Sequence, residues 1–511
     1  MLITLVGTGL LLLGLHKFYH HVISRRSLPY PPGPPGDFII GNLRQMPLKY
    51  AWFAFDEWRR KYGPINYLNI AGKPIVVIHT QEAAVDLLDR RSAIYSERPR
   101  FVMACELAGL DQDTALMPYG DAHRVHRKLF AQALHPRVVE RDYAQLEERH
   151  AHKLANLLLD NPDDFMNHIE LCMGTIIQTI TYGEDDGDVD FVELGRTNMK
   201  HINGIAQGYL VELLPWLKHI PKWFPGAQFH HDAKATKEIA AKAQWLPFNM
   251  VKEKAETGIA PPSYVLSALD VMKTAKDVDP EIISMSALTL FSGGTEATSA
   301  TLSGFILAML LHPDVQSRAQ AEIDRVAGDL LPSLASRASM PYMNALLTEI
   351  LRWNPSVPIG IPHNVKQDDA YNGYYIPAGA MILVNARGIL HDERHFPDPS
   401  TFNPDRFLNV DQSDHDANTS RPDPWDVIFG YGRRVCPGLS VAQTGLWITM
   451  TTILSCFDIR PKLDPKTIKP IIPEPNFSGS TISYPLPFVC DIKPRSRAHA
   501  ERIAEAVAQG W

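Results

Sequence analysis

The chain is poor in cysteine: five occur among 511 residues, and no two of them are spaced as CxxC. An odd number without paired spacing argues against a disulfide framework and against a structural zinc site. A reducing compartment is therefore the simpler expectation. The five are Cys105, Cys172, Cys436, Cys456 and Cys490.

The sequence also lacks a basic stripe, an internal repeat and an interior linker. Its net charge is -7 and its pI is about 6.3, and no basic run is interleaved with aromatic residues. We therefore expect no nucleic-acid partner. The longest Pro-rich run lies near the N-terminus, at residues 29–36. With 45% hydrophobic residues, the rest of the chain can bury the core of one large globular unit.

The N-terminus is apolar over residues 1–15, and its extension to residue 23 yields a helix that can cross a hydrocarbon core of about 30 Å. No charged segment precedes this run and no A-x-A site follows it. A retained anchor is therefore favoured over the alternative, a cleaved signal peptide. Arg25 and Arg26 follow the span, which places the main body on the cytoplasmic side.

We accordingly expect a membrane anchor at 1–23, a Pro-rich hinge at 24–36 and a globular domain at 37–511. In this orientation the two N-x-S/T sequons, at Asn418 and Asn476, stay unmodified. In the opposite orientation they become glycosylation candidates.

Hydrophobic periodicity predicts a mainly α-helical domain with a small β region. Residues 280–311 carry only two formal charges, Glu281 and Glu296, so this helix should be buried and cross the middle of the protein. The C-terminal tail is Pro-rich and is predicted to be strand-like. Further helices are expected at 50–62, 121–134, 339–353 and 439–457, a hairpin at 65–80 that turns at AGKP, and two short strands within 373–386.

One cysteine stands apart: Cys436 lies in FGYGRRVCPG, residues 429–438. Chance would supply the spacing FxxGxRxCxG on the order of 10⁻⁴ times in a chain this long. A thiolate needs a metal or positive surroundings, glycines let a flat ligand approach closely, and Arg434 can reach an anionic group of that ligand. The alternative is a buried structural cysteine in a Gly-rich loop. The pattern favours a thiolate bound to haem iron, where it promotes O–O cleavage.

On these residues the chain resembles the cytochrome P-450 family of haem-thiolate monooxygenases, from residue 31 onward. The resemblance implies the cytochrome P-450 fold with one N-terminal transmembrane helix, and a haem-thiolate catalytic domain at 37–511. It implies haem as the cofactor, Cys436 as the proximal iron ligand and Phe429 packed beside the sulfur. Arg434 is expected to help bind the haem.

A second motif is the ExxR pair Glu349 and Arg352, which share one helical face. Alone it is weak, and the alternative is a solvated surface pair. The resemblance implies that both bind Arg406 of PDRF in a buried charge network that supports the cysteine loop. The same spacing recurs at Glu57/Arg60, Glu97/Arg100 and Glu322/Arg325.

Two further segments resemble sites that bind haem propionates. His363 lies in PIGIPH, and its alternative is a surface histidine at the end of a strand. Arg127 lies in YGDAHRVHRKLF, where the family pattern is WxxxR. His123 stands in place of the tryptophan, and a histidine can still donate a hydrogen bond.

Within the central apolar segment, FSGGTEATSATL resembles the oxygen-activating motif [A/G]-G-x-[D/E]-T-T. Gly293 and Gly294 are expected to open a groove for dioxygen and water. Glu296 matches the acid and Thr298 the second threonine, and both are expected to be catalytic.

Ala297 replaces the first threonine, whose hydroxyl steadies proton delivery in the family. Three possibilities stay open: a substrate hydroxyl substitutes, Thr298 or Thr301 substitutes together with water, or the enzyme does not activate dioxygen in the usual way.

The resemblance predicts a monooxygenase that inserts one oxygen atom from O2 into a lipophilic small molecule, with electrons from an NADPH-dependent cytochrome P-450 reductase. Segments such as DDAYNGYYIP and WFPGA look closest to fungal members of secondary metabolism. The alternatives are a haem-thiolate isomerase or dehydratase, suggested by Ala297, and a non-catalytic haem-binding protein. Eight apolar residues are expected at the pocket: Phe101, Met103, Leu107, Leu110, Phe291, Val357, Ile359 and Phe477.

The expected location is the endoplasmic reticulum membrane, with a single pass and a cytoplasmic catalytic domain. WFPGAQF, residues 223–229, is predicted to touch the membrane near a substrate entrance. Arg124 and Lys128 are candidate charges for docking the reductase, although a solvated helix face explains them equally well.

Overall fold

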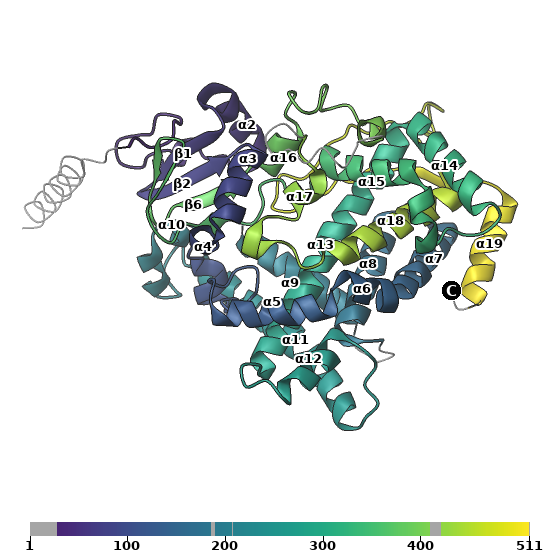
Figure 1. The fold of residues 1–511 in the computed structure, drawn as a ribbon, viewed down its shortest axis with the longest axis horizontal. Coiled ribbons are helices and arrows are strands. Elements are labelled where there is room, and N and C mark those ends of the chain that lie inside the picture. Colours follow the sequence, from purple (N-terminus) through teal and green to yellow (C-terminus); the bar gives the residue numbers. More distant parts are fainter. Residues whose placement is uncertain (1–27, 185–189, 207, 409–420, 510–511) are drawn as a thin grey trace, which may run out of the picture.

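The computed structural model describes residues 28–184, 190–206, 208–408 and 421–509. The predicted anchor at 1–23 and the sequon at Asn418 lie outside the described residues. The described chain is mainly α-helical with small sheets, as predicted. Figure 1 shows β1, β2 and β6 at one end and α7, α14, α15, α18 and α19 toward the other, with α13 between them.

The centre of the protein is α13 (Pro280–Leu311), a single 32-residue helix. Asp279 caps its first turn by accepting a hydrogen bond from the backbone N–H of Ile282, and Pro280 occupies its first position, where a missing N–H costs nothing. Nearly the whole second half is buried. The prediction of a buried helix over 280–311 is confirmed.

Helices surround α13 on several sides, and the closest is α8 (Phe165–Tyr182). A Cβ atom at Gly294 would lie 3.0 Å from the side chain of Ile177 on α8. Glycine is therefore needed here for the two helices to approach each other. The neighbouring Gly293, by contrast, borders open space, because an added Cβ there meets no atom within 4 Å.

Among the described residues, α13 and α18 (Leu439–Cys456) are long and apolar enough to cross a membrane. Most of each helix is buried inside the protein, so both serve as core helices here. The remaining helices are α2 (Ala51–Tyr62), α3 (Gln81–Ala84), α4 (Ser92–Tyr95), α5 (Asp121–Ala133), α6 (Pro136–Val138), α7 (Ala144–Asp160), α9 (Phe191–Ile205), α10 (Leu210–Leu213), α11 (Gln228–Glu256), α12 (Tyr264–Met272), α14 (Pro313–Ala327), α15 (Pro341–Trp353), α16 (Ala386–Leu390), α17 (Pro424–Ile428) and α19 (Arg497–Ala508).

The main sheet has the strand order β1-β2-β6-β3. β1 (Ile65–Ile70) and β2 (Lys73–Ile78) form the predicted hairpin, which turns through Ala71 and Gly72, both at positive φ. β6 (Met381–Val384) runs parallel to β2, and β3 (His363–Asn364) is antiparallel to β6. Two antiparallel pairs form separate two-stranded sheets: β4 (Asp369–Tyr371) with β5 (Tyr374–Ile376), and β7 (Phe457–Arg460) with β8 (Asp491–Pro494).

The prediction of a strand-like C-terminal tail is wrong for its last part. β8 is a strand, but the chain then forms the helix α19. Only Ile503 is buried on this helix. The helix therefore lacks the periodic row of apolar residues from which an amphipathic helix is predicted. Alanine, with its high helix propensity, and not hydrophobic periodicity, specifies the segment RAHAERIAEAVA.

Candidate active site

The cysteine loop connects α17 to α18. The backbone N–H of Cys436 donates a 2.7 Å hydrogen bond to the carbonyl of Phe429, which closes the loop on itself. Gly432 has φ +56°, and a Cβ atom there would lie 2.2 Å from the carbonyl oxygen of Leu88. A side chain at this position would therefore push the loop away from the segment 85–90 beneath it.

The surroundings of the Cys436 sulfur have opposing effects on its pKa. Burial raises its pKa, while the backbone N–H of Gly438 and the charge of Arg127 lower it. The side chain of Cys436 nevertheless has accessible surface. Because burial raises the pKa of the sulfur, this surface faces a space inside the protein. Because the pKa is raised, a bound cation is needed to hold the sulfur as a thiolate. Among the described residues no cluster of three histidine, cysteine or acidic side chains is arranged to hold a metal ion.

Phe429 contributes more than its carbonyl. Its ring stacks on Trp425, with centroids 5.5 Å apart, and the indole of Trp425 donates to the hydroxyl of Thr348 on α15. The aromatic pair thereby joins the start of the loop to α15. That Phe429 packs beside the sulfur remains a prediction.

The side chain of Arg434 is hydrogen-bonded to three backbone carbonyls. Its guanidinium donates to the carbonyls of Ser96, Thr114 and Met117 at 2.7 to 3.1 Å. Burial lowers its pKa to about 10. Arg127 donates to the carbonyl of Val435 at 2.7 Å, so both predicted arginines lie at the cysteine loop.

The two predicted histidines lie in the same region. His363 is buried in β3 and bonds through Nδ1 to the carbonyl of Tyr95; a surface position is thereby excluded. Burial lowers its pKa to about 3, and Arg98 and Arg434 add to the effect. His123 is buried on α5, and burial with Arg434 and Arg127 lowers its pKa to about 3.

Sequence reasoning missed Arg98. Its guanidinium donates to the carbonyls of Ala115, Ile361 and Pro362. Burial and the charge of Arg434 lower its pKa to about 9. The available signal was an arginine before a proline in SERPR, which is too common to single out without the fold.

These five basic groups form what we call the cationic cluster: Arg98, His123, Arg127, His363 and Arg434. Within it the arginines lower the pKa values of both histidines, and Arg434 and Arg127 lower those of Arg98 and Arg434, respectively. The acids Asp113 and Glu97 oppose this effect. The Nδ1 atom of His123 is buried and has no hydrogen-bond partner among the described residues. A buried excess of positive charge with an unpartnered donor or acceptor fits a ligand that carries carboxylates. Haem, with two propionates, fits both this cluster and a single thiolate.

The ExxR pair is buried, as the resemblance implied. Glu349 accepts from Arg352 at 2.6 and 2.8 Å, and both side chains have no exposed surface. Arg406 lies 3.6 Å from the same carboxylate. Arg352 also donates to the carbonyls of Leu390, Pro399 and Thr401, so the network ties α15 to the chain that leads to the cysteine loop.

The other ExxR spacings do not form such pairs. Arg60 bonds to Asp56 at the surface, and Arg100 bonds to Glu106. Glu322 instead accepts from the backbone N–H groups of Tyr342 and Met343, at the start of α15.

On α13, Glu296 points its carboxylate at α9. Both oxygens lie 3.2 Å from the amide nitrogen of Asn203. Burial raises the pKa of Glu296, and the bond from Asn203 partly offsets this. Asn203 is a second residue that the sequence did not disclose, because an asparagine on a helix carries no motif.

The threonine hydroxyls of α13 are bonded to their own helix. Thr298 donates to the carbonyl of Gly294, and Thr301 donates to that of Ala297. Ala297 lies one turn after Gly293, so the two share the face that borders open space. This face therefore carries no hydroxyl at position 297.

Three of the eight predicted pocket residues, Met103, Leu110 and Phe291, are buried in the core, and Phe477 is partly buried against it. Phe291 is 3% exposed and packs against Tyr182 and Gly195. Phe477 packs edge-on against Trp353. Ordinary packing accounts for both phenylalanines.

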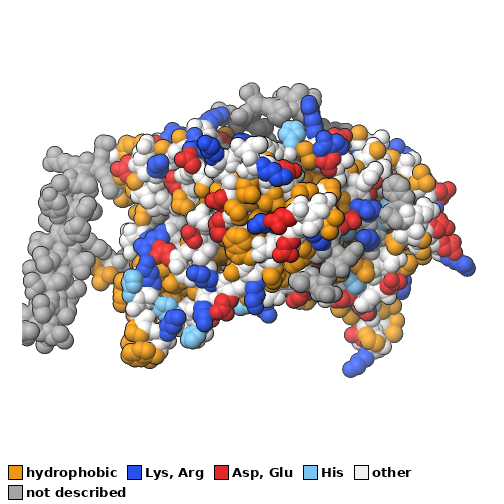
Figure 2. All heavy atoms as spheres, turned by 90° about the horizontal axis from the view of Figure 1, so that it is seen from below, with side chains coloured by type: hydrophobic (Ala, Val, Ile, Leu, Met, Phe, Trp, Pro, Cys, Tyr) orange, Lys and Arg blue, Asp and Glu red, His pale blue; other side chains and the backbone are white. Residues whose placement is uncertain are grey.

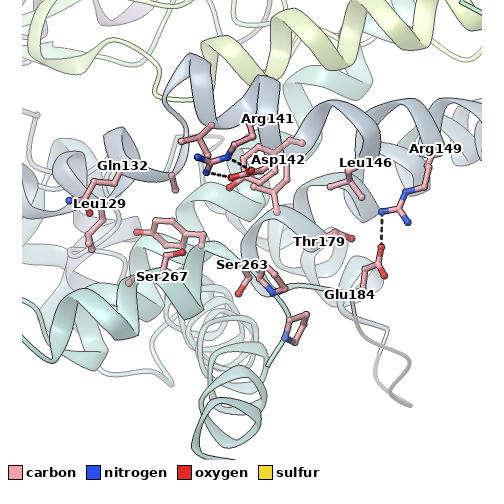
Figure 3. A pocket seen from close by; sticks show the side chains of 18 residues that line it. Leu129, Gln132, Arg141, Asp142, Leu146, Arg149, Thr179, Glu184, Ser263 and Ser267 are labelled. Carbon is pink, nitrogen blue, oxygen red and sulfur yellow. Dashed lines mark hydrogen bonds and ion pairs between the residues drawn. The ribbon is translucent and has the colours of Figure 1, made fainter. Parts of the chain in front are cut away.

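A surface pocket lies away from the cysteine loop, between α5, α7, α8 and α12 (Figure 3). It holds about 400 Å³ and is rimmed by two ion pairs, Arg141 with Asp142 and Arg149 with Glu184. None of the predicted site residues lines it. This pocket is therefore separate from the site predicted from the motifs.

Comparisons with known proteins agree with this geometry. The sequence model of the cytochrome P450 family, described as "Cytochrome P450", matches residues 31–484. Cytochrome P450 monooxygenase 98 of Postia placenta is 36% identical, over 96% of this chain and 95% of that protein. Cytochrome P450 monooxygenase claR of Ampulloclitocybe clavipes is 34% identical over 98% and 93%, and COX2 of Coprinopsis cinerea is 36% identical over 93% and 90%.

Proposed function

The chain belongs to the cytochrome P450 family, and we propose that it is a membrane-anchored monooxygenase of fungal secondary metabolism that inserts one oxygen atom from O2 into a lipophilic small molecule. The observation that carries this proposal is the combination of Cys436, in a loop that closes on itself, with the cationic cluster beside it.

In this proposal Cys436 is the thiolate ligand of the haem iron, and the cationic cluster binds the haem carboxylates. When bound, the haem supplies oxygen activation, which a thiolate ligand favours. Gly438 directs its backbone N–H toward the sulfur, and Gly432 keeps the loop close to the segment below. The buried Glu349–Arg352 pair supports the cysteine loop by tying α15 to the chain that leads to it.

Glu296 is the proposed proton carrier. Its side chain is partly exposed and burial raises its pKa, and both features suit a carboxyl group that takes up and releases protons. Asn203 orients it toward α9. Thr298 gives its own hydrogen to Gly294 and can therefore only accept from a water or from the substrate.

The membrane association rests on two exposed apolar segments at the sheet end of the protein. Phe38 and Leu48 are more than nine-tenths exposed, and Trp216 and Trp223 are exposed by 62% and 80%. The β1–β2 turn joins these segments: the N–H of Ala71 bonds to Ile40, and Lys73 bonds to the carbonyl of Glu212. Figure 2 shows hydrophobic side chains gathered at this end. Such a surface suits contact with lipid next to the proposed anchor.

Electrons are proposed to come from NADPH through a reductase that docks beside the cysteine loop. Exposed cations there include Arg433, which stacks over the ring of Tyr119 at 4.8 Å, and Lys128 on α5. Arg124 is paired with Asp121, so its charge is partly compensated. Turnover with reductase should fall with rising salt if these charges steer docking.

A second candidate function follows from Ala297. A haem-thiolate isomerase or dehydratase would need no proton relay to oxygen. The names of the relatives, all monooxygenases, support the first function.

The experiment is NADPH consumption by the full-length protein with a reductase, screened against a library of lipophilic compounds with products read by mass spectrometry. Consumption that depends on a compound and yields a product heavier by one oxygen atom supports the proposal. A product that forms without NADPH supports the isomerase or dehydratase.

The Ala297→Thr variant then tests the proton route. Improved coupling of NADPH consumption to product is expected if a missing hydroxyl limits proton delivery. Worse coupling with unchanged substrate binding would assign that role to a hydroxyl of the substrate.

A further inference from the structure

A buried acid, Asp113, lies in the loop between the helical turn 102–107 and α5. This loop is fastened to the cationic cluster through its backbone: Arg98 donates to the carbonyl of Ala115 at 2.7 Å, and Arg434 donates to those of Thr114 and Met117. Asp113 therefore sits at the edge of the proposed haem site, on the side of α13.

Each oxygen of Asp113 has a distinct partner. One accepts from the backbone N–H of Ala115 at 2.8 Å. The other lies 3.0 Å from the hydroxyl of Thr289 on α13, whose single hydrogen is shared with the carbonyl of Met285, also at 3.0 Å. The first contact is a local turn that many loops contain. The second is not local, and it binds the loop to the central helix. The backbone N–H of Thr114 adds a 3.2 Å bond to the same hydroxyl.

Thr289 places this contact on the open face of α13. Thr289, Gly293 and Ala297 follow one another at intervals of four residues and so share one side of the helix. Gly293 borders open space and Ala297 keeps accessible surface. Thr289 and Asp113 also keep accessible surface, which for groups this far inside faces an internal space.

The carboxylate retains capacity to accept a further hydrogen bond. An ionised carboxylate offers roughly four acceptor positions. Burial raises the pKa of Asp113, and the N–H groups of Ala115 and Leu116, the hydroxyl of Thr289 and the charge of Arg98 lower it only in part. Charged groups are rarely buried unless hydrogen bonds or ion pairs satisfy them fully. Residues near Asp113 and Thr289 in the sequence include the buried apolar side chains Leu110, Met117 and Leu288.

We propose that Asp113, oriented by Thr289, is a specificity-determining group that recognises a hydroxyl on an otherwise apolar substrate. The hydroxyl would donate to the free acceptor position of the carboxylate. This inference rests on the proposed function, because it assumes that the open face of α13 borders the substrate pocket.

The test compares matched ligands on the haem-loaded, full-length protein. The probes are borneol, cedrol and testosterone, each beside its methyl ether, with dissociation constants taken from the shift of the haem absorption band. A hydroxyl that donates to a charged acceptor should bind about tenfold more tightly than its ether. The preference should fall to about one in Asp113→Ala and to an intermediate value in Asp113→Asn.

The matched control is Asp111→Asn, since Asp111 is exposed and bonds only to its neighbour Gln112. It should leave the preference unchanged. If Asp113→Ala fails to take up haem, the isosteric Asp113→Asn variant decides.

Equal binding of alcohols and ethers by the unmodified protein, or a preference that keeps its full size in Asp113→Asn, overturns this inference and leaves the proposed function standing. A protein to which no probe binds, alcohol or ether, would contradict the lipophilic pocket of the proposed function and the inference with it.

Discussion

Replacing Glu349 by glutamine removes one charge from the most deeply buried ion pair of the described chain. The carboxylate accepts from Arg352 at 2.6 and 2.8 Å and from the backbone N–H of Asn403 at 2.7 Å. Glutamine has only one carbonyl oxygen. If that oxygen serves Arg352 Nη2 and Asn403, its NH2 group must face Arg352 Nε, donor against donor.

The expected cost is about 3–5 kcal/mol, because the guanidinium of Arg352 remains buried without a counter-charge. It keeps its bonds to the carbonyls of Leu390, Pro399 and Thr401, but carbonyls do not neutralise it. A loss of this size is a large part of a typical stability of about 5–15 kcal/mol.

Urea unfolding followed by circular dichroism, with haem kept in excess, measures this loss. The control is Glu57→Gln, which removes the glutamate of another ExxR spacing at an exposed position and should change stability by less than about 0.5 kcal/mol. A Glu349→Gln protein within about 1 kcal/mol of the unmodified one would refute the view that the pair is a buried, mutually dependent unit.

Three further results are expected. Arg98→Leu should weaken haem uptake about tenfold in a haemin titration, through loss of a charged donor, whereas the exposed Arg100→Leu should not; equal effects would remove Arg98 from the site. Gly432→Ala should cost about 2–5 kcal/mol, since it combines a positive φ with a Cβ atom 2.2 Å from a carbonyl oxygen, against about 1 kcal/mol for Gly373→Ala, which has a positive φ in open space; similar losses would contradict the close contact. Burial lowers the pKa of His79 to about 3, below the unfolded value of about 6.5, so its contribution to stability is present above about pH 6.5 and is lost as the pH falls toward 3. Urea midpoints should therefore fall more steeply on acidification in the unmodified protein than in His79→Asn, and parallel curves would argue against the shift.

The sequence predicted those parts of the fold that leave a local pattern. Residues 280–311 are apolar nearly all round, and α13 has these bounds. The segment AGKP predicted the turn of the hairpin, and the turn passes through Ala71 and Gly72. α19 left no such pattern, because its stability comes from alanine propensity and one buried isoleucine.

At the site, the motifs located the cysteine loop, both predicted arginines and both histidines in one region of the fold. Arg98 and Asn203 escaped because their roles depend on contacts with segments distant in the sequence, such as Arg98 with Ile361 and Asn203 with Glu296. Side-chain direction was also beyond the motif: Gly294 packs on Ile177 and does not open the predicted groove. Spacing along one helix shows which residues share a face, but not which neighbouring helix that face meets.

The most direct test of the account is the absorption spectrum of the reduced, haem-loaded protein with carbon monoxide, recorded before and after Cys436→Ser. A thiolate ligand gives the haem its characteristic absorption, so the band should move or vanish in the variant, while Cys105→Ser should leave it in place. A Cys436→Ser protein with an unaltered spectrum, or an unmodified protein that takes up no haem, would contradict the assignment of this sulfur as the iron ligand.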